Sequence, residues 1–350
     1  ILFFISFEFI HRMLFELDNA KTIMRIFGYY WFSYFAVRSL KTKFIDTYIS
    51  IMVFFATVSL IFYIVSIIPG INHIIYNFAD TTFPIKRDYL NERSPTLIIY
   101  TFTPGYFEGY DTYLRNAGFT WEAGTFGFFL NFALFLIMVK EKLSVRRIFT
   151  NRKSLLLIIA MITTVSTTAF TVFCLYLAFF SLSEKGIKKY IMIILVGGFI
   201  LYSFSNFEFL LNKINTQLEE SDRHNNRFGS VLSDGVDIVQ RPLFGWSRKE
   251  SVLFGLDANS SATHRPNGIT NQIRNYGLIY IIVFFGILYT SFKKYFISQD
   301  KRNAKALSIM LVTIIIISAF SELILDKNIM KSFLFLFFTY KFYPTKSLQN

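Results

Sequence analysis

The chain has 350 residues, of which 53% are hydrophobic, 19% aromatic and only 17% charged, and its mean hydropathy is +0.43. Soluble domains carry about 25% charged residues, and the apolar residues here form long uninterrupted blocks, so composition excludes a large soluble core and indicates a polytopic membrane protein. The net charge of +13 lies in short loops between these blocks, which argues against nucleic acid as a partner.

The apolar blocks predict an all-α fold, a single integral membrane domain over residues 1–350 with about 9–11 membrane segments and a large, partly helical periplasmic loop. The first block begins at Ile1 inside an apolar run, so we expect the natural chain to start upstream. The predicted membrane segments cover residues 1–10, 22–37, 47–68, 123–139, 154–183, 190–207, 275–292, 306–321 and 332–340.

The distribution of charge between these blocks predicts the orientation. Four loops are strongly basic and are expected in the cytoplasm: 38–46, 140–153, 184–189 and 293–305. The segment 72–122 has four basic and six acidic residues, and the segment 207–275 has eight of each. We expect these two segments to be the extracytoplasmic loops.

Residues 154–183 must then enter the membrane and return, because both flanking loops are predicted to be cytoplasmic. Thirty residues are too few for two full crossings of about 20 residues each. We therefore predict a hairpin of two short or kinked helices with its turn in the run of hydroxyl residues at 163–168. The alternative is one long tilted helix, which would invert the orientation of everything that follows.

Sequence motifs for metal, nucleotide and hydrolase chemistry are absent. The four histidines have no metal-ligand spacing, the single cysteine, Cys174, lies in an apolar block, and no P-loop, Asp-x-Asp or Gly-x-Ser-x-Gly occurs. We therefore predict neither a metal site nor a cofactor.

Arginines in the two outer segments are the remaining candidates for chemistry. The guanidinium group is permanently charged and binds phosphate with two parallel hydrogen bonds. Arg115 lies just before a membrane segment, and Arg227 and Arg265 lie in the long outer loop. They are candidates for binding the pyrophosphate of a polyprenyl-linked substrate. The alternative is that they balance nearby acids or contact membrane phospholipid.

Four further residues are candidates for the same site. Glu122 could serve as a general base at the membrane edge, or it could be an acid favoured by the N-terminus of a helix. His264 could orient or deprotonate an acceptor hydroxyl, or be a solvated loop residue. Trp246 could stack on a sugar ring or cover a small core in the loop, and Asn267 belongs to a turn that starts a helix.

Three pieces of this sequence resemble the O-antigen polymerase/ligase superfamily, the Wzy-like membrane proteins. The first is Arg115-Asn-Ala-Gly-Phe-Thr-Trp-Glu122-Ala-Gly124, which resembles the family's R-x-x-G-x-x-x-E-P-G entry to a transmembrane helix, with Ala123 in place of proline. The second is Ser166-Thr-Thr168, which is similar to its T-x-S-T-T turn. The third is the long loop with Arg227-Phe, Pro242-Leu-Phe-Gly-Trp246 and Asn267-Gly followed by Tyr276-Gly. Together they cover roughly half of the chain.

The resemblance implies a metal-independent glycosyltransferase in the bacterial cytoplasmic (inner) membrane. It would polymerise undecaprenyl-pyrophosphate-linked oligosaccharide repeat units into surface polysaccharide, with the active site on the outer face. Arg115, Arg227 and Arg265 would stabilise the departing pyrophosphate, and Glu122 or His264 would activate the acceptor hydroxyl. The lipid-linked glycan, the bilayer and a chain-length regulator protein are the expected partners.

Three alternatives remain open. One is an O-antigen ligase that transfers glycan to lipid A–core, since ligases of this family use a histidine near the position of His264. Another is a polysaccharide flippase, which would carry charged residues within its helices, whereas the apolar segments here are nearly free of charge. The last is a sensor or structural membrane protein whose long loop binds a partner.

Overall fold

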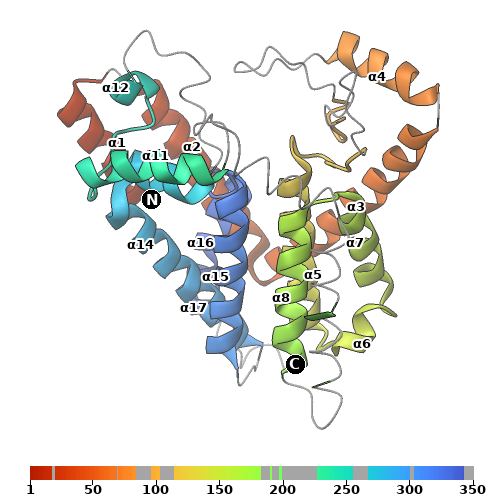
Figure 1. Cartoon of the computed structure of the whole chain (residues 1–350). Helices are drawn as coiled ribbons and strands as arrows, with labels where there is room; N and C mark the ends of the chain where they lie inside the picture. The colour runs from red at the N-terminus through yellow and green to blue at the C-terminus, as the bar shows by residue number, and fades with distance from the viewer. Residues whose placement is uncertain are drawn as a thin grey trace. The chain divides into compact units, whose positions relative to one another are not determined.

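The computed structural model describes residues 1–17, 20–68, 70–83, 96–102, 114–182, 190, 197–198, 227–254, 267–299 and 303–342. These residues are mostly helical and include no strands, as the sequence predicts. They form two compact units, one from Ile1–Phe44 with Gln217–Asn350 and the other from Ile45–Thr216. Figure 1 shows the helices coloured along the chain.

The first unit contains the N-terminal and C-terminal helices. They are α1 (Leu2–Phe15), α2 (Ala20–Leu40), the 3₁₀ turn η1 (Lys41–Lys43), α11 (Arg227–Gln240), α12 (Glu250–Phe254), α14 (Gly268–Ser298), α15 (Ala304–Ser321), α16 (Asn328–Leu334) and α17 (Leu336–Phe342). The long helix α14 is the centre of this unit, since α1, α11, α15, α16 and α17 all contact it, and α16 also packs on α2 (Figure 1).

The second unit contains the helices of the middle of the chain. They are α3 (Phe44–Ile67), α4 (Ile71–Thr82), α5 (Ala123–Lys140), α6 (Val145–Ile148), α7 (Arg152–Thr163) and α8 (Thr167–Ser181). The helix α5 contacts both α7 and α8 and is buried at every position from Ala123 to Val139. A helix that is apolar all round must be enclosed by other helices or by lipid, and here neighbouring helices enclose it.

Four helices among the described residues are long and apolar enough to cross a membrane, which indicates a membrane protein. They are Ala20–Ile67, which runs through α2, η1 and α3, together with α5, α14 and α15; α8 is apolar but shorter. The predicted segment 190–207 lies outside the described residues except for positions 190, 197 and 198. The prediction of 9–11 segments therefore stays a prediction.

The chain turns at two places within the predicted membrane segments. Residues 164–166 separate α7 from α8, inside the hydroxyl run where the sequence predicts a turn. The segment predicted over 332–340 is also divided, since α16 ends at Leu334 and α17 begins at Leu336. The hydroxyl of Ser291 on α14 donates to the Leu334 carbonyl at 2.9 Å and accepts from the Phe337 amide at 3.2 Å. A tertiary contact thus satisfies the backbone groups beside this second break.

The helix α14 is kinked at Gly277, whose φ of +81° lies in the left-handed region. The Trp246 and Ser247 amides donate to the carbonyls of Arg274 and Asn275 at 2.8 and 3.0 Å, and the Leu278 amide donates to the Pro242 carbonyl at 2.7 Å. The loop between α11 and α12 therefore takes up the backbone groups that the kink releases, which is a recognised cause of helix bending.

Candidate functional site

The loop that carries Arg115 lies against the break between α7 and α8. The Asn116 amide donates to the Thr163 carbonyl at 2.9 Å, and Nε of Arg115 donates to the Thr164 carbonyl at 3.1 Å. These carbonyls belong to the last turn of α7, where no further helical turn supplies amide donors. Two pieces of the chain that are about 50 positions apart are thus joined at the end of a helix.

The Asn116 side chain fixes this contact. Its amide group donates to the hydroxyls of Ser59 at 3.1 Å and Thr163 at 2.9 Å, and its carbonyl oxygen accepts from the Gly118 amide at 3.0 Å. Asn116 is fully buried. Each such hydrogen bond contributes about 1 kcal/mol net, and an unsatisfied buried amide would cost more. The loop is therefore held in one position on α3 and α7.

The backbone geometry on both sides of the contact is specific. Val165 has a left-handed φ of +46°, and the Ser166 hydroxyl then accepts from the Ala169 amide at 3.3 Å as the N-cap of α8. Gly118, with a φ of +53°, lies against the ring of Phe126, where a Cβ would come within 2.6 Å of a ring carbon. Only glycine allows the loop to approach α5 this closely.

Glu122 is the N-cap residue of α5, and its side chain is exposed and makes no capping hydrogen bond. Its backbone carbonyl accepts from the Thr120 hydroxyl at 2.7 Å. The adjacent Trp121 is 47% exposed. Glu122 therefore lies at the start of the buried helix α5, and the half-buried Arg115 of the same unit contacts the α7–α8 break.

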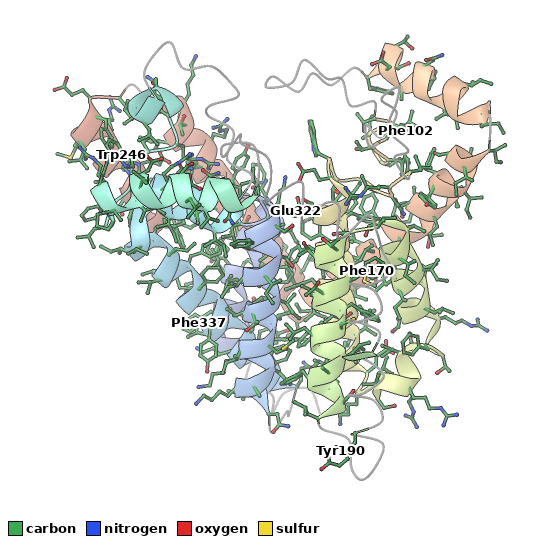
Figure 2. The ribbon with its side chains drawn as sticks, in the orientation of Figure 1. Phe102, Phe170, Tyr190, Trp246, Glu322 and Phe337 are labelled. Carbon is green, nitrogen blue, oxygen red and sulfur yellow. The ribbon has the colours of Figure 1, made fainter. Side chains whose placement is uncertain are left out.

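Trp246 is packed against α1 and α11 in the first unit. Its indole Nε1 donates to the Asp237 carbonyl of α11 at 2.8 Å, and its ring stacks on Phe15 of α1 with centroids 6.4 Å apart. The Arg241 guanidinium lies 4.7 Å from the Trp246 ring centroid and 4.8 Å from that of Phe15. Figure 2 labels Trp246 beside these helices. These contacts favour the small-core interpretation of Trp246 over a sugar platform.

Of the remaining predicted site residues, the structure describes only Asn267 in full. Asn267 is fully buried and caps α14, since its side chain accepts from the Ile269 and Thr270 amides at 3.0 Å each. Arg227 is the first residue of α11, and its side chain lies outside the described part of the structure. His264 and Arg265 also lie outside the described residues. Within the described part of the chain, the structure therefore joins Arg115 to the threonine turn, and a shared site for the three arginines stays a prediction.

A second polar cluster, which the sequence analysis did not select, lies beside the kinked end of α14. Arg248 forms an ion pair with Asp326 at 3.0 Å, and its guanidinium lies 5.9 Å from the Tyr276 ring centroid. The Lys331 ammonium donates to the Asp326 carbonyl at 2.7 Å and faces the ring of Tyr29 at 5.0 Å. These charges come from separate parts of the chain, so sequence spacing gives no signal of the cluster.

Buried acids and tyrosines continue this cluster into the unit. The Tyr276 hydroxyl donates to the carboxylate of Glu8, which is 1% exposed, at 2.6 Å. The Tyr280 hydroxyl shares a hydrogen bond of 3.0 Å with Tyr30. At the head of α14, Arg274 and Asp234 form a buried ion pair at 3.4 Å that ties α11 to α14. Ionisable groups buried in a membrane protein are costly, and they are usually paired or functional.

No group of three or more histidines, cysteines, aspartates or glutamates that could hold a metal ion occurs among the described residues. Comparison with known proteins adds no assignment to this geometry. No family model, no curated protein and no solved structure matches the chain.

Proposed function

We propose that the chain is a membrane glycosyltransferase that polymerises undecaprenyl-pyrophosphate-linked oligosaccharide repeat units at the outer face of the bacterial cytoplasmic membrane. One observation carries this proposal: Arg115, in the first of the pieces that resemble the O-antigen polymerase/ligase superfamily, donates to the carbonyl of Thr164, two residues before the second piece, Ser166-Thr-Thr168, in the same turn. Two motifs far apart in the sequence are expected to meet if both serve one site.

The chemistry assigned to this site is glycosyl transfer with pyrophosphate as the leaving group. The acceptor hydroxyl attacks the anomeric carbon of the donor sugar, the bond from that carbon to the phosphate oxygen breaks, and the pyrophosphate departs with the electron pair. Arg115, oriented by its Nε bond to Thr164, stabilises the negative charge that develops there. Glu122, exposed at the start of α5, accepts the hydroxyl proton. His264 is the other candidate base.

The reaction should depend on the two parallel hydrogen bonds that the guanidinium group of Arg115 can donate, and not only on its positive charge. In reconstituted vesicles given an undecaprenyl-pyrophosphate-linked repeat unit, without nucleotide or metal, the wild-type chain should form a ladder of polymers. Arg115→Lys, which keeps the charge, should reduce the rate by about 100-fold, in the range of a lost transition-state donor. Arg146→Gln, at an exposed arginine of α6, is the matched control and should keep the full rate.

The outcomes of this experiment separate the candidate functions. A normal ladder from Arg115→Lys would contradict the assigned role of Arg115. Products that appear only after lipid A–core is added would indicate a ligase. No transfer to either acceptor, with a cognate repeat unit, would contradict the enzyme proposal as a whole.

A flippase is a second candidate, and the burial of charged side chains within helices of the first unit favours it. Glu8 is 1% exposed within α1 and Lys331 is 3% exposed within α16, although the sequence suggested apolar segments nearly free of charge. Transporters place such groups along their substrate pathway. Movement of a fluorescent lipid-linked sugar across the vesicle membrane, without any transfer product, would support this candidate.

A further inference from the structure

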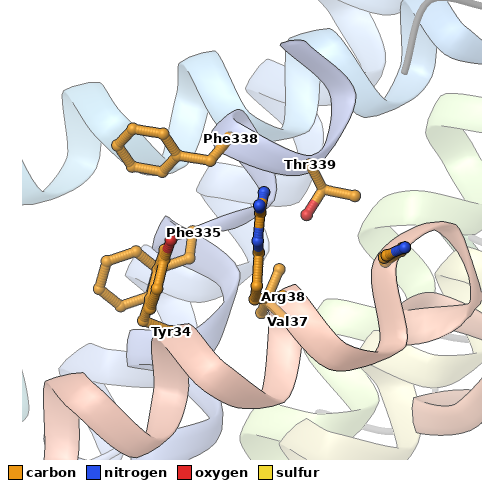
Figure 3. Close-up of a pocket in the computed structure, with 7 residues that line it drawn as sticks. Tyr34, Val37, Arg38, Phe335, Phe338 and Thr339 are labelled. Atoms are coloured by element: carbon orange, nitrogen blue, oxygen red, sulfur yellow. The ribbon is translucent and has the colours of Figure 1, made fainter. Parts of the chain in front are cut away.

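Helix α11 has an exposed apolar face, away from the residues assigned to glycosyl transfer. Leu232, Val236 and Val239 are 67%, 63% and 79% exposed, and their spacing of four and three residues puts them in one row along the helix. The hollow between α2 and α17 in Figure 3, by contrast, has room for only about one water molecule. An exposed apolar row suits a partner that covers an area, and not a small ligand that fills a pocket.

The opposite face of α11 is polar and packs on the protein. Ser230 and Asp234 are fully buried. Asp234 pairs with Arg274 of α14 at 3.4 Å and accepts from the Thr270 hydroxyl at 2.5 Å. The polar residues of α11 thus lie inside and its apolar residues outside, the reverse of a helix on the surface of a water-soluble protein. This arrangement is stable where the outer face contacts hydrocarbon or another protein, because contact with water is unfavourable over the whole apolar area.

The exposed apolar residues continue from α11 onto α14. The Leu278 amide donates to the Pro242 carbonyl at 2.7 Å, so the loop after α11 lies directly against α14. Leu243 in this loop is 53% exposed, and Leu278 and Ile282, one turn apart on α14, are 38% and 66% exposed. Exposed apolar residues thus follow one another from α11 through the loop to α14.

The length of α14 indicates the level of this region relative to a membrane. Helix α14 is apolar enough to cross a bilayer. At 1.5 Å per residue, its part from Leu278 to Ser298 rises about 32 Å, close to the roughly 30 Å thickness of the hydrocarbon core. The kink at Gly277, and the loop that is bonded to it, then lie at one edge of the core.

The direction of α11 agrees with a position at this edge. Figure 1 shows that α11 runs across the direction of α15, which is also apolar enough to span a membrane. A helix that lies across a spanning helix lies along the membrane surface, and α11 packs on α14 in this direction.

We propose that α11 lies in the plane of the membrane at its surface, with Leu232, Val236 and Val239 inserted among the acyl chains of the lipid. Helices with one apolar face bind membranes in this way, with that face about 5–10 Å into the boundary between headgroups and acyl chains. The partner is lipid rather than a second copy of the chain, because the exposed apolar residues continue to Ile282 in the spanning part of α14.

Nitroxide labels on the full-length chain in vesicles of phosphatidylcholine and phosphatidylglycerol test this proposal. Cys174 is the single cysteine and is buried, so Cys174→Ala provides the background for single cysteines. Oxygen, which concentrates in hydrocarbon, and a nickel chelate, which stays in water, are the two relaxing reagents. The ratio of oxygen to nickel accessibility at V236C should be at least about fivefold that at K249C, an exposed loop position, because the apolar face lies about 5–10 Å into the headgroup–acyl boundary.

The same measurement excludes the other surroundings of the row. I282C, in the spanning part of α14, is the matched control for contact with hydrocarbon, and V236C should resemble it. A ratio at V236C equal to that at K249C would place the row in water and overturn the proposal. Low accessibility of V236C to both reagents would overturn it in favour of a cover made of protein.

The depth of two labels tests the direction of the helix. L232C and V239C lie two helical turns apart, about 10 Å along the axis of α11. Both labels should report the same depth, whereas a difference of about 10 Å would overturn the proposal in favour of a helix that enters the membrane. All three positions on α11 are exposed, so the labels should leave the fold intact. If V236C is nevertheless not monodisperse, L232C replaces it in the accessibility test, with the same expected ratio and the same overturning outcomes.

Discussion

Lys331 is a lysine that is almost fully buried in the middle of α16, outside the four apolar spans. Burial is the main cause that lowers the pKa of its ammonium group from 10.5 to about 8. The positive charges of Arg248, Arg25 and Lys327 lower this pKa further, whereas the negative charge of Asp326 raises it. Burial disfavours the charged form, so the unfolded chain holds this proton more tightly than the folded protein does. Between pH 8 and 10.5 the unfolded state therefore binds more protons, and the contribution of Lys331 to stability rises with pH.

This gives a prediction for the Lys331→Met variant, which lacks the titrating group. When the pH is raised from 7.5 to 10, the Tm of the wild type should gain about 3 °C or more relative to the Tm of Lys331→Met. Tryptophan fluorescence during heating in detergent measures both values. Lys305→Met, at an exposed position of α15, serves as the control. A Tm difference that stays constant over this pH range would contradict the burial of an ammonium group at position 331.

Asn131 shows at the same scale why a polar residue occurs in an otherwise apolar helix. It is fully buried in α5, and its amide group donates to the Gly127 and Ala169 carbonyls at 3.0 Å each. Its side-chain oxygen accepts from the Tyr176 hydroxyl of α8 at 3.2 Å. Gly127 lies so close to Ala169 that a Cβ would come within 2.6 Å of the alanine side chain. Small and polar residues at such crossings are characteristic of helices packed in membranes.

At the scale of the element, the kink in α14 depends on Gly277. A Cβ on this residue would lie 2.0 Å from the Leu243 carbonyl oxygen, and the φ of +81° is strained for any other residue. We expect Gly277→Ala to destabilise the protein by about 3 kcal/mol or more, because the loop at 242–247 must move away from α14 and lose its hydrogen bonds.

Gly286 of the same helix is a matched control for this prediction. A Cβ there would meet nothing within 4 Å, so Gly286→Ala should be neutral or stabilising by up to about 1 kcal/mol. Thermal unfolding of the three proteins in one detergent compares them. The prediction fails if the two glycine variants unfold at the same temperature, since the kink would then not require a glycine.

The sequence predicts the straight elements better than the broken ones. The apolar blocks at 22–37, 47–68, 123–139 and 306–321 correspond to α2, α3, α5 and α15, because hydrophobic length is a local property. The kink at Gly277 and the α16–α17 break depend on Pro242 and Ser291, which are distant in sequence. A glycine within an apolar run is compatible with a straight helix, so local patterning could not locate the kink.

The same distinction applies to the candidate site. The loop at Arg115 and the threonine turn each have a local sequence signal, but their contact through Asn116 and Thr163 follows only from the fold. The cluster of Arg248, Asp326 and Lys331 has no local signal, because Arg248 lies in the loop before α12, far in sequence from the turn and the helix α16 that carry Asp326 and Lys331. Individual charged residues are visible in the sequence, whereas their pairing is a tertiary property.

At the scale of the whole molecule, the central question is which side of the membrane each loop faces. Helix α5 has 18 residues and therefore rises about 27 Å, close to the thickness of a bilayer core. A helix of this length that crosses the bilayer has its two ends on opposite sides. The charge pattern predicts that Arg115 and Glu122 lie outside and that the basic residues from Lys140 onward lie in the cytoplasm, and this orientation stays a prediction. The proposed transfer reaction requires this orientation, since its substrate is presented at the outer face.

Single cysteines at the two ends of α5 test the orientation in intact cells. The native Cys174 is buried, and Cys174→Ala gives a background without thiols. On that background, W121C should react with a membrane-impermeant maleimide in intact cells, and K142C should react only after permeabilisation, because both positions are exposed but lie at opposite ends of α5. The reverse pattern would put Arg115 in the cytoplasm and remove the proposed outer-face reaction. Equal labelling of both positions in intact cells would mean that α5 does not separate two compartments, and the bundle would then need a different arrangement around its most buried helix.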